Sequence, residues 1–334
     1  MATLYLLEQG TSVYKDYRRF IIHVPEKNKL EVPIKEVERI LVFGNVQLST
    51  PVINVCLQTP ISILFLSPSG QYKGHLWSMD AINFDLELSQ FEKKTNSPYQ
   101  LKVCRSIVRG KLINSRQLLM RLNRKHKLAS VKRAIDGIDS DLQRVEVVDN
   151  LDTLRGYEGA SAARYFPALG QLITNAEFSF AQRHRQPPTD PINSLLSFGY
   201  TILFNNVLSL ILVEGLSPYF GNFHYGERKK PYLAFDLMEE FRSPIVDSLV
   251  LKMINKPLFK SNDFEVLAQN QGVYLTDEAR RTFLSHLESR MNEKVSHPDL
   301  QSPVSYRHAI QLQIRRYRRS LLSSTLYEPF LRST

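Results

Sequence analysis

The sequence contains little cysteine and glycine for its 334 residues, with two Cys, 14 Gly and 17 Pro. So few glycines and prolines, without a repeat, exclude a fibrous or low-complexity chain. Cys56 and Cys104 form no CxxC pair and are not spaced with histidine as in a zinc finger. A disulfide framework and a structural zinc site are therefore not supported, and both residues are expected to be buried, reduced thiols.

Acidic residues are fewer than basic ones: the chain has 33 Asp and Glu and 43 Lys and Arg, for a formal net charge of +10. An excess of positive charge predicts attraction to a polyanion, of which nucleic acid is the commonest. The alternative is a basic protein whose surface is merely solvated. Charge alone does not separate the two.

The chain shows no secretory signal, because its first 20 residues lack a basic region, a long apolar core and a small-residue cleavage site. We therefore expect a cytoplasmic protein. The one long apolar run, 194–216, approaches the length that spans a bilayer. It carries Asn205 and Asn206 at its centre and Glu214 near its end, which favours a buried core helix over a membrane span.

The pattern of the chain changes after about residue 77. The first part is a series of short strand-like segments with one helix at 50–59, for which Thr50 is the expected N-cap and Pro51 the first helical residue. The rest has helical spacing, with helices expected at 99–125, 130–150, 157–184, 192–215, 233–254, 277–294 and 303–323. We predict an α+β protein with a β-rich, sandwich-like domain at 1–84, which would mediate dimerisation, and an all-α catalytic domain at 85–334.

Residues 221–255 hold the most informative cluster of polar side chains. A loop with His224 leads into a helix in which Asp236, Glu239 and Glu240 share overlapping parts of one face, beside an apolar stripe. Like charges at this spacing repel each other, and a divalent cation would relieve the repulsion. The alternative is an ordinary solvated acidic face.

A second candidate, Glu158, lies in the sequence LDTLRGYEGASAARYFPAL. We place it near the start of a helix, followed by a run of small residues, 160–163, that would let another helix approach closely. Glu158 could then reach a site shared with a second helix. The alternative is a first-turn glutamate that only complements the helix dipole.

Four segments in this order resemble the signature blocks of a known family. They are VRGKLINSRQLLMRL, GYEGASAARYFPAL, GNFHYG and LAFDLMEEFRSPIVDSLVLKMIN. Together with the β-then-α layout, they resemble the CRISPR-associated adaptation endonuclease/integrase, the subunit that acquires spacers. The resemblance covers nearly the whole chain.

The resemblance implies that Glu158, His224 and Glu239 are catalytic and bind one divalent metal. Asp236 is implied as a second ligand or as a group behind the ligands, and its division of labour with Glu239 stays open because some relatives have Asp at the latter position. One imidazole and two or three carboxylates form a hard N/O donor set that suits Mg²⁺ or Mn²⁺. A metal there would activate water for strand cleavage, or a 3′-hydroxyl for strand joining by transesterification.

DNA would be held by basic residues around this acidic site. The run Arg228, Lys229 and Lys230 lies between His224 and Asp236, and further clusters occur, such as 121–127. The residues that we expect to contact DNA are Arg228, Lys229, Lys230, Arg164, Lys111 and Arg116. Such contacts are mostly to phosphates and largely independent of sequence, and no motif that reads bases occurs.

The sequence therefore predicts a metal-dependent DNA endonuclease and integrase that inserts short fragments into a CRISPR array. Its implied partners are duplex DNA with free 3′-hydroxyl ends, CRISPR repeat DNA, a second copy of the chain and a small ferredoxin-like adaptation protein. The alternative is a non-catalytic DNA-binding scaffold whose acids are ion-paired to neighbouring Arg and Lys. RNA processing is disfavoured, since no RNP-type or GXXG motif occurs.

Overall fold

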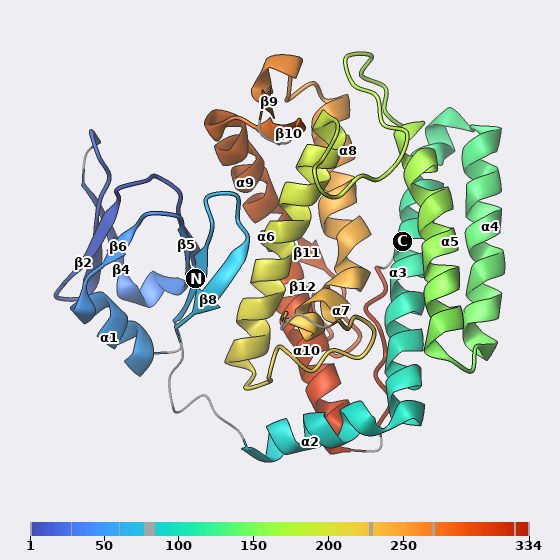
Figure 1. Cartoon of the computed structure of the whole chain (residues 1–334), viewed down its shortest axis with the longest axis horizontal. Helices are drawn as coiled ribbons and strands as arrows, with labels where there is room; N and C mark the ends of the chain where they lie inside the picture. Colours follow the sequence, from blue (N-terminus) through green and yellow to red (C-terminus); the bar gives the residue numbers. More distant parts are fainter. Residues whose placement is uncertain are drawn as a thin grey trace.

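The computed structural model describes residues 2–27, 29–59, 61–76, 84–226, 230–268, 271–323 and 325–332. Strands occupy the first part of the chain and helices dominate the rest, which confirms the predicted α+β class. Figure 1 shows the strands of the first 76 residues at one side of the molecule, with α6 (Pro191–Val213) between them and the group formed by α3 (Ser97–His126), α4 (Ala129–Val147) and α5 (Leu151–Gly170).

Two four-stranded sheets make up the N-terminal part. One has the order β1-β5-β7-β8, in which β1, β5 and β7 are parallel and β8 is antiparallel to β7. The other has the order β4-β3-β2-β6. The strands are β1 (Ala2–Leu6), β2 (Ser12–Asp16), β3 (Arg19–His23), β4 (Leu30–Pro33), β5 (Val37–Phe43), β6 (Gln47–Leu48), β7 (Ser62–Leu66) and β8 (Tyr72–His75). Buried residues of both sheets share one core, as predicted for a sandwich-like unit.

Strand β5 shows why the first sheet joins the two parts of the protein. Its run RILVF is buried on both faces, which is typical of a parallel strand covered on two sides. Ile40 and Val42 belong to the sandwich core, whereas Leu41 and Phe43 belong to the main core with the helices. Period-two alternation thus directs one side of the strand to each core.

The helices of the second part follow the predicted spacing with shifted ends. They are α2 (Phe84–Thr95), α3 (Ser97–His126), α4 (Ala129–Val147), α5 (Leu151–Gly170), α6, α7 (Tyr232–Phe241), α8 (Ser248–Asn255), α9 (Asp277–Asn292) and α10 (Tyr306–Leu322). A π-helical turn, η3 (Arg242–Asp247), joins α7 to α8. Pro244 lies in this turn, where its missing N–H disrupts the regular hydrogen-bond ladder.

Three predicted helix boundaries are wrong. Helix α5 begins at 151 rather than 157, because the side chain of Asn150 accepts a hydrogen bond from the N–H of Thr153. It ends at Gly170 rather than 184, where the carbonyl oxygen of Phe180 lies 1.9 Å from the position that a Cβ would occupy. The N-cap of helix α1 (Thr50–Gln58) is Ser49 instead of Thr50, so Pro51 is the second helical residue rather than the first.

Helix α6 is the one described helix that is long and apolar enough to cross a membrane. Most of its residues are buried within the protein, and it packs against β7, α7 and α10. Its central Asn205 and Asn206 are fully buried, and the Asn205 amide donates to the carbonyl of Gly70 at 3.0 Å. The predicted core helix is confirmed.

Two details of the second part depart from an all-α domain. Strand β9 (Phe264–Leu267) pairs with β10 (Gly272–Leu275), and β11 (Lys294–Val295) pairs with β12 (Val304–Ser305). The predicted boundary between residues 84 and 85 falls at the first turn of α2, and 77–83 lie outside the described residues.

Cys56 and Cys104 are buried free thiols, as expected.

Candidate active site

The three acids of α7 are all buried, with exposures of 0% for Asp236, 3% for Glu239 and 0% for Glu240. The alternative of a solvated acidic face is therefore wrong. Helix α7 is surrounded by α3, α6, η3 and α10, so each carboxylate meets a different set of neighbours. The predicted single acidic cluster is also wrong, because Glu240 faces the C-terminal segment rather than His224.

Asp236 organises the loop that precedes its own helix. Its Oδ2 accepts the backbone N–H groups of Asn222, at 2.5 Å, and Phe223, at 3.0 Å. Its Oδ1 accepts the N–H of His224 at 2.9 Å and lies 2.8 Å from Nδ1 of the same residue. Asp236 thus fixes both the backbone and the ring of His224, which is the usual role of a carboxylate behind a histidine ligand.

The other ring nitrogen of His224 faces the site. Its Nε2 lies 3.8 Å from Oε1 of Glu239. A hydrogen on Nδ1 directed at Asp236 leaves the lone pair on Nε2, which is the form that binds metals. Glu239 therefore lies on the Nε2 side of the imidazole, and Asp236 lies on its Nδ1 side.

Glu239 and Glu158 converge on one ammonium group. Nζ of Lys111, on α3, lies 2.6 Å from Oε2 of Glu239 and also contacts Oε1 of Glu158, on α5. Nη2 of Arg242 lies 2.9 Å from Oε1 of Glu239. Helices α3, α5, α7 and the turn η3 therefore meet at a cation held between two carboxylates.

The charge state of Glu239 follows from these neighbours. Burial by itself would raise the pKa of this carboxyl, but the charges of Arg242 and Lys111 outweigh it and lower the pKa from 4.5 to about 2. Glu239 raises the pKa of Lys111 and of Arg242 in return, against their burial. At neutral pH the site contains an ionised, buried carboxylate.

Glu158 lies well inside α5, seven residues after its first residue, so its predicted place at a helix start is wrong. The alternative of a first-turn glutamate that only complements the helix dipole is also wrong, because Glu158 is not in the first turn. Of the small residues 160–163, only Ser161 is buried, and its hydroxyl donates to Asp141 of α4 at 2.8 Å. Helix α5 is thereby fixed against α4 while Glu158 faces Lys111.

Within the described ranges, no three His, Cys, Asp or Glu side chains are gathered closely enough to hold a metal ion. Lys111 lies between two of the expected ligands, Glu158 and Glu239, and its ammonium pairs with both carboxylates. Oε2 of Glu239 is buried, and its contact is the ammonium of Lys111. Two carboxylates and an imidazole nitrogen are nevertheless the donor chemistry that a hard divalent cation requires.

The residues expected to contact DNA have varied surroundings. Arg228 and Lys229 lie outside the described residues, and Lys230 is exposed just before α7. Lys111 contacts the two site carboxylates, Arg116 contacts Asp139, and Arg164 contacts Asp141. The structure brings only Lys111 of this group into contact with the acids of the site.

Two residues of the site escaped the sequence analysis. Arg242 contacts Glu239, with its guanidinium 4.8 Å from the ring centroid of Tyr200. Arg155, one turn before Glu158, donates to the carbonyl of Phe223 at 2.8 Å and lies over the rings of Phe223 and Tyr225. Arg155 thus clamps the loop on both sides of His224. The three-residue spacing of each arginine from a site acid was the available signal.

Comparisons with known proteins agree over most of the chain. The family described as "CRISPR associated protein Cas1" matches residues 4–289. An endonuclease of Rhodospirillum rubrum named Cas1 2 is 35% identical over 90% of this chain and 89% of its own length. The Cas1 1 endonuclease of Thermus thermophilus is 33% identical over 98% of both chains. A Cas4/Cas1 fusion of Geobacter sulfurreducens is 32% identical over 93% of this chain, which spans 57% of the fusion.

Solved structures show the same fold. A Cas1 protein from Thermotoga maritima superposes with a TM-score of 0.83 at 25% identity, covering 99% of this chain and 100% of that one. A casposase bound to its integration product gives a TM-score of 0.84 at 21% identity, over 98% of this chain and 93% of the other. The casposase supports the fold alone.

The fold and site define an α+β protein in which one imidazole and buried carboxylates meet between four helical elements. The chain belongs to the family of CRISPR-associated Cas1 proteins.

Proposed function

We propose that this protein is a metal-dependent DNA endonuclease and integrase that inserts short DNA fragments into a CRISPR array during adaptation. Membership of the Cas1 family and the endonuclease names of its relatives support the proposal. The observation that carries it is the position of Glu239, which lies 3.8 Å from Nε2 of His224 and shares the ammonium of Lys111 with Glu158, so that side chains from three separate elements meet.

Glu158, Nε2 of His224 and Glu239 would hold one Mg²⁺ or Mn²⁺. When bound, the ion would supply polarisation of a phosphoryl oxygen and activation of the attacking oxygen. Glu239 is already ionised at neutral pH, so no proton must leave it. Asp236 holds the proton of His224 at Nδ1 and orients the ring.

The same centre serves two reactions, depending on which oxygen attacks the phosphate. Attack by water cleaves the strand, whereas attack by the 3′-hydroxyl of a DNA end joins two strands while one phosphodiester bond breaks. Arg242 is placed beside Glu239, where it keeps this carboxylate ionised and adds positive charge next to the phosphate. Burial of the carboxylate strengthens each of these interactions.

Duplex DNA with free 3′-hydroxyl ends and CRISPR repeat DNA are the proposed substrates, in the cytoplasm. Lys230, together with Arg228 and Lys229, would grip phosphates beside the site, and Arg116 and Arg164 would do so by exchanging their carboxylate partners for phosphate. A homodimer formed through the β domains would place two active sites at a set separation. A solved complex of a Cas6-RT-Cas1 protein with Cas2, which shares this fold, favours a small adaptation protein as second partner.

The test is an incubation of the protein with supercoiled plasmid and short duplex DNA, in Mg²⁺, in Mn²⁺ and in chelator. Nicked or joined products should require metal and disappear in Glu158→Ala and His224→Ala. Matched controls are Glu278→Ala and His286→Ala on α9, whose side chains are exposed. These controls should behave as the wild type.

One observation favours the scaffold alternative, namely that Glu239 is ion-paired with Lys111 and Arg242. If Glu158→Ala and His224→Ala bind DNA as the wild type does, and no protein yields metal-dependent products even with the small adaptation partner, then the acids are structural. The enzyme proposal would be wrong in that case.

A further inference from the structure

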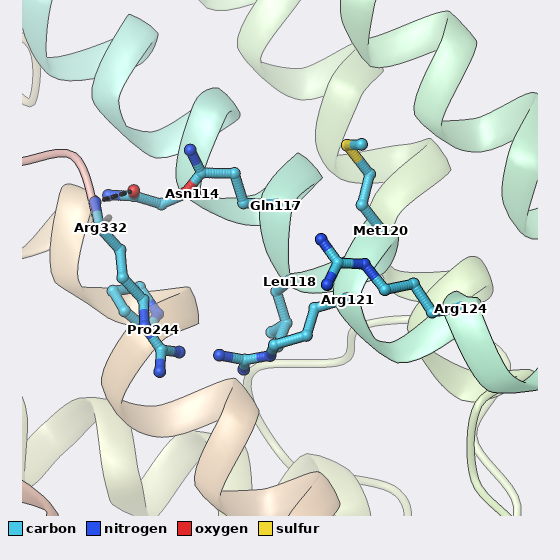
Figure 2. Close-up of a pocket in the computed structure, with 8 residues that line it drawn as sticks. All are labelled: Asn114, Gln117, Leu118, Met120, Arg121, Arg124, Pro244 and Arg332. Atoms are coloured by element: carbon cyan, nitrogen blue, oxygen red, sulfur yellow. Dashed lines mark hydrogen bonds between the residues drawn. The ribbon is translucent and has the colours of Figure 1, made fainter. Parts of the chain in front are cut away.

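A pocket beside the C-terminal half of α3 is lined by three arginines. Its walls are formed by α3, η3 and the C-terminal segment, with Asn114, Gln117, Leu118, Met120, Arg121, Arg124, Pro244 and Arg332 as lining residues. Figure 2 shows the guanidinium groups of Arg121 and Arg124 extending from α3 toward the side where Arg332 lies over Pro244. No carboxylate is among the lining residues.

These arginines lack partners that would neutralise them. Within the part of the chain that the structure describes, Arg121, Arg124 and Arg332 form no ion pair. Burial and the nearby charges of Arg332 and Arg290 lower the pKa of Arg121, which indicates that like charges are held close together. An anion in the pocket would offset that repulsion.

A second arginine cluster, on α10, provides the contrast. Arg315 lies 2.8 Å from Glu214, and Arg319 lies 2.6 Å from Asp299. The hollow around them is lined by those two acids and by Glu328 as well as by arginines. Each arginine of the α10 cluster is therefore paired with a carboxylate of the protein, whereas those of the α3 pocket are not.

Asn114 links three segments near the pocket, namely α3, α7 and the C-terminal segment. Its amide donates to the carbonyls of Glu240, at 2.7 Å, and Phe330, at 2.9 Å, and its oxygen accepts the backbone N–H of Arg332 at 2.9 Å. Asn114 is one turn from Lys111 on α3, so the same helix carries the site cation and the pocket. Arg332 is held in place by its backbone, which leaves its side chain available to a ligand.

We propose that the pocket formed by Arg121, Arg124 and Arg332 binds a phosphodiester group of a DNA strand whose reacting phosphate occupies the active site. The inference rests on the proposed function, since it takes DNA as the substrate. Guanidinium groups bind phosphate oxygens through paired, directional N–H donors. Lys111 and Arg121 are ten residues apart on α3, about 15 Å along its axis, which corresponds to about four to five nucleotides of duplex.

The first test measures DNA affinity against salt concentration for the full-length protein. Arg121→Gln, Arg124→Gln and Arg332→Gln should each weaken binding of a 30-base-pair duplex by about five- to tenfold and reduce the slope of log K against log salt by about 1. The matched control is Arg319→Gln, which removes one charge from the ion-paired cluster on α10. Its DNA affinity should stay within about twofold of that of the wild type. If the pocket variants behave as Arg319→Gln does, the proposal is overturned.

The second test locates the phosphate. Duplexes with a single uncharged methylphosphonate are scanned along one strand, from the reacting end inward. One position, within about six nucleotides of the reacting phosphate, should weaken binding to the wild type but have little further effect on Arg121→Gln, because the variant has already lost that contact. Equal effects at every position in both proteins would contradict a specific phosphate site.

The two proposals fail in different ways. If wild-type protein yields no metal-dependent product but the methylphosphonate position still couples to Arg121, the enzyme proposal fails and the pocket stands. If joining is normal in the wild type and the pocket variants retain wild-type affinity and salt slope, the pocket fails and the enzyme proposal stands.

Discussion

Two adjacent residues of α7, Glu239 and Glu240, are both buried yet lie in opposite electrostatic surroundings. The active-site side of the helix presents Lys111 and Arg242 to Glu239, whose pKa falls to about 2. The tail side presents neutral donors to Glu240, namely the hydroxyl of Tyr327, the backbone N–H of Phe330 and the amide of Gln313.

Neutral donors only partly offset burial on the tail side. Desolvation raises the pKa of Glu240 to about 7, although its hydrogen bonds and the charge of Arg316 act in the other direction. The comparison shows that two neighbouring acids on one helix can differ in charge state. The cations that contact Glu239 keep it ionised, whereas Glu240 receives its hydrogen bonds from neutral donors.

The largest expected effect is a difference in activity between substitutions of these two glutamates. Glu239→Gln should reduce metal-dependent nicking and joining by more than 100-fold, because even the partners of metal ligands typically contribute 10- to 100-fold. Glu240→Gln should retain most activity, since its side chain faces the C-terminal segment. The measurement is the initial rate of plasmid nicking under saturating Mn²⁺. Equal losses in both variants would contradict the assignment of Glu239 as the ligand.

The next effect concerns stability against pH. Below about pH 4.5 the carboxyl of Glu240 is protonated in both folded and unfolded protein. Between pH 4.5 and 7 the folded state keeps its proton while the unfolded state loses it, so stability should fall as pH rises across this window. The loss is roughly 2–4 kcal/mol at full ionisation.

Urea unfolding from pH 5 to 8 checks this dependence. The wild type should lose stability with rising pH relative to Glu240→Gln, whereas the exposed control Glu278→Gln should parallel the wild type. Glu239 acts in the opposite sense, since its lowered pKa stabilises the protein above about pH 4.5 and this contribution is lost as pH falls toward 2. Parallel curves for Glu240→Gln and the wild type would show that Glu240 is ionised throughout.

The sequence predicted the fold class, the helical spacing and the core helix α6, because these depend on hydrophobic period and composition. It also singled out Asp236, Glu239 and His224, which one helix and its preceding loop bring together. The spacing of the acids alone did not separate Glu239 from Glu240, and only the family resemblance named Glu239. That difference depends on Lys111, Arg242 and the C-terminal segment, which arrive from other parts of the chain. Long-range contacts of this kind leave no local pattern in the sequence.

A smaller effect sharpens the contrast between ligand and supporting acid. Asp236→Asn keeps the size of the side chain but loses acceptor capacity for the N–H groups of Asn222, Phe223 and His224. We expect a 10- to 100-fold loss of activity, typical of groups behind a histidine ligand, with weaker Mn²⁺ binding by calorimetry. Activity equal to that of the wild type would show that the loop keeps its shape without this carboxylate.

The smallest effect concerns the ammonium that lies between the carboxylates. Lys111→Met removes the cation between Glu158 and Glu239, so a divalent ion would no longer compete with it. A partly buried ion pair of about 1 kcal/mol corresponds to roughly fivefold tighter Mn²⁺ binding. Calorimetry at pH 7.5 measures the change, with Lys102→Met, an exposed position on the same helix, as the matched control. Weaker binding in Lys111→Met than in the control would mean that the lysine holds the ligands in place rather than competing with the metal.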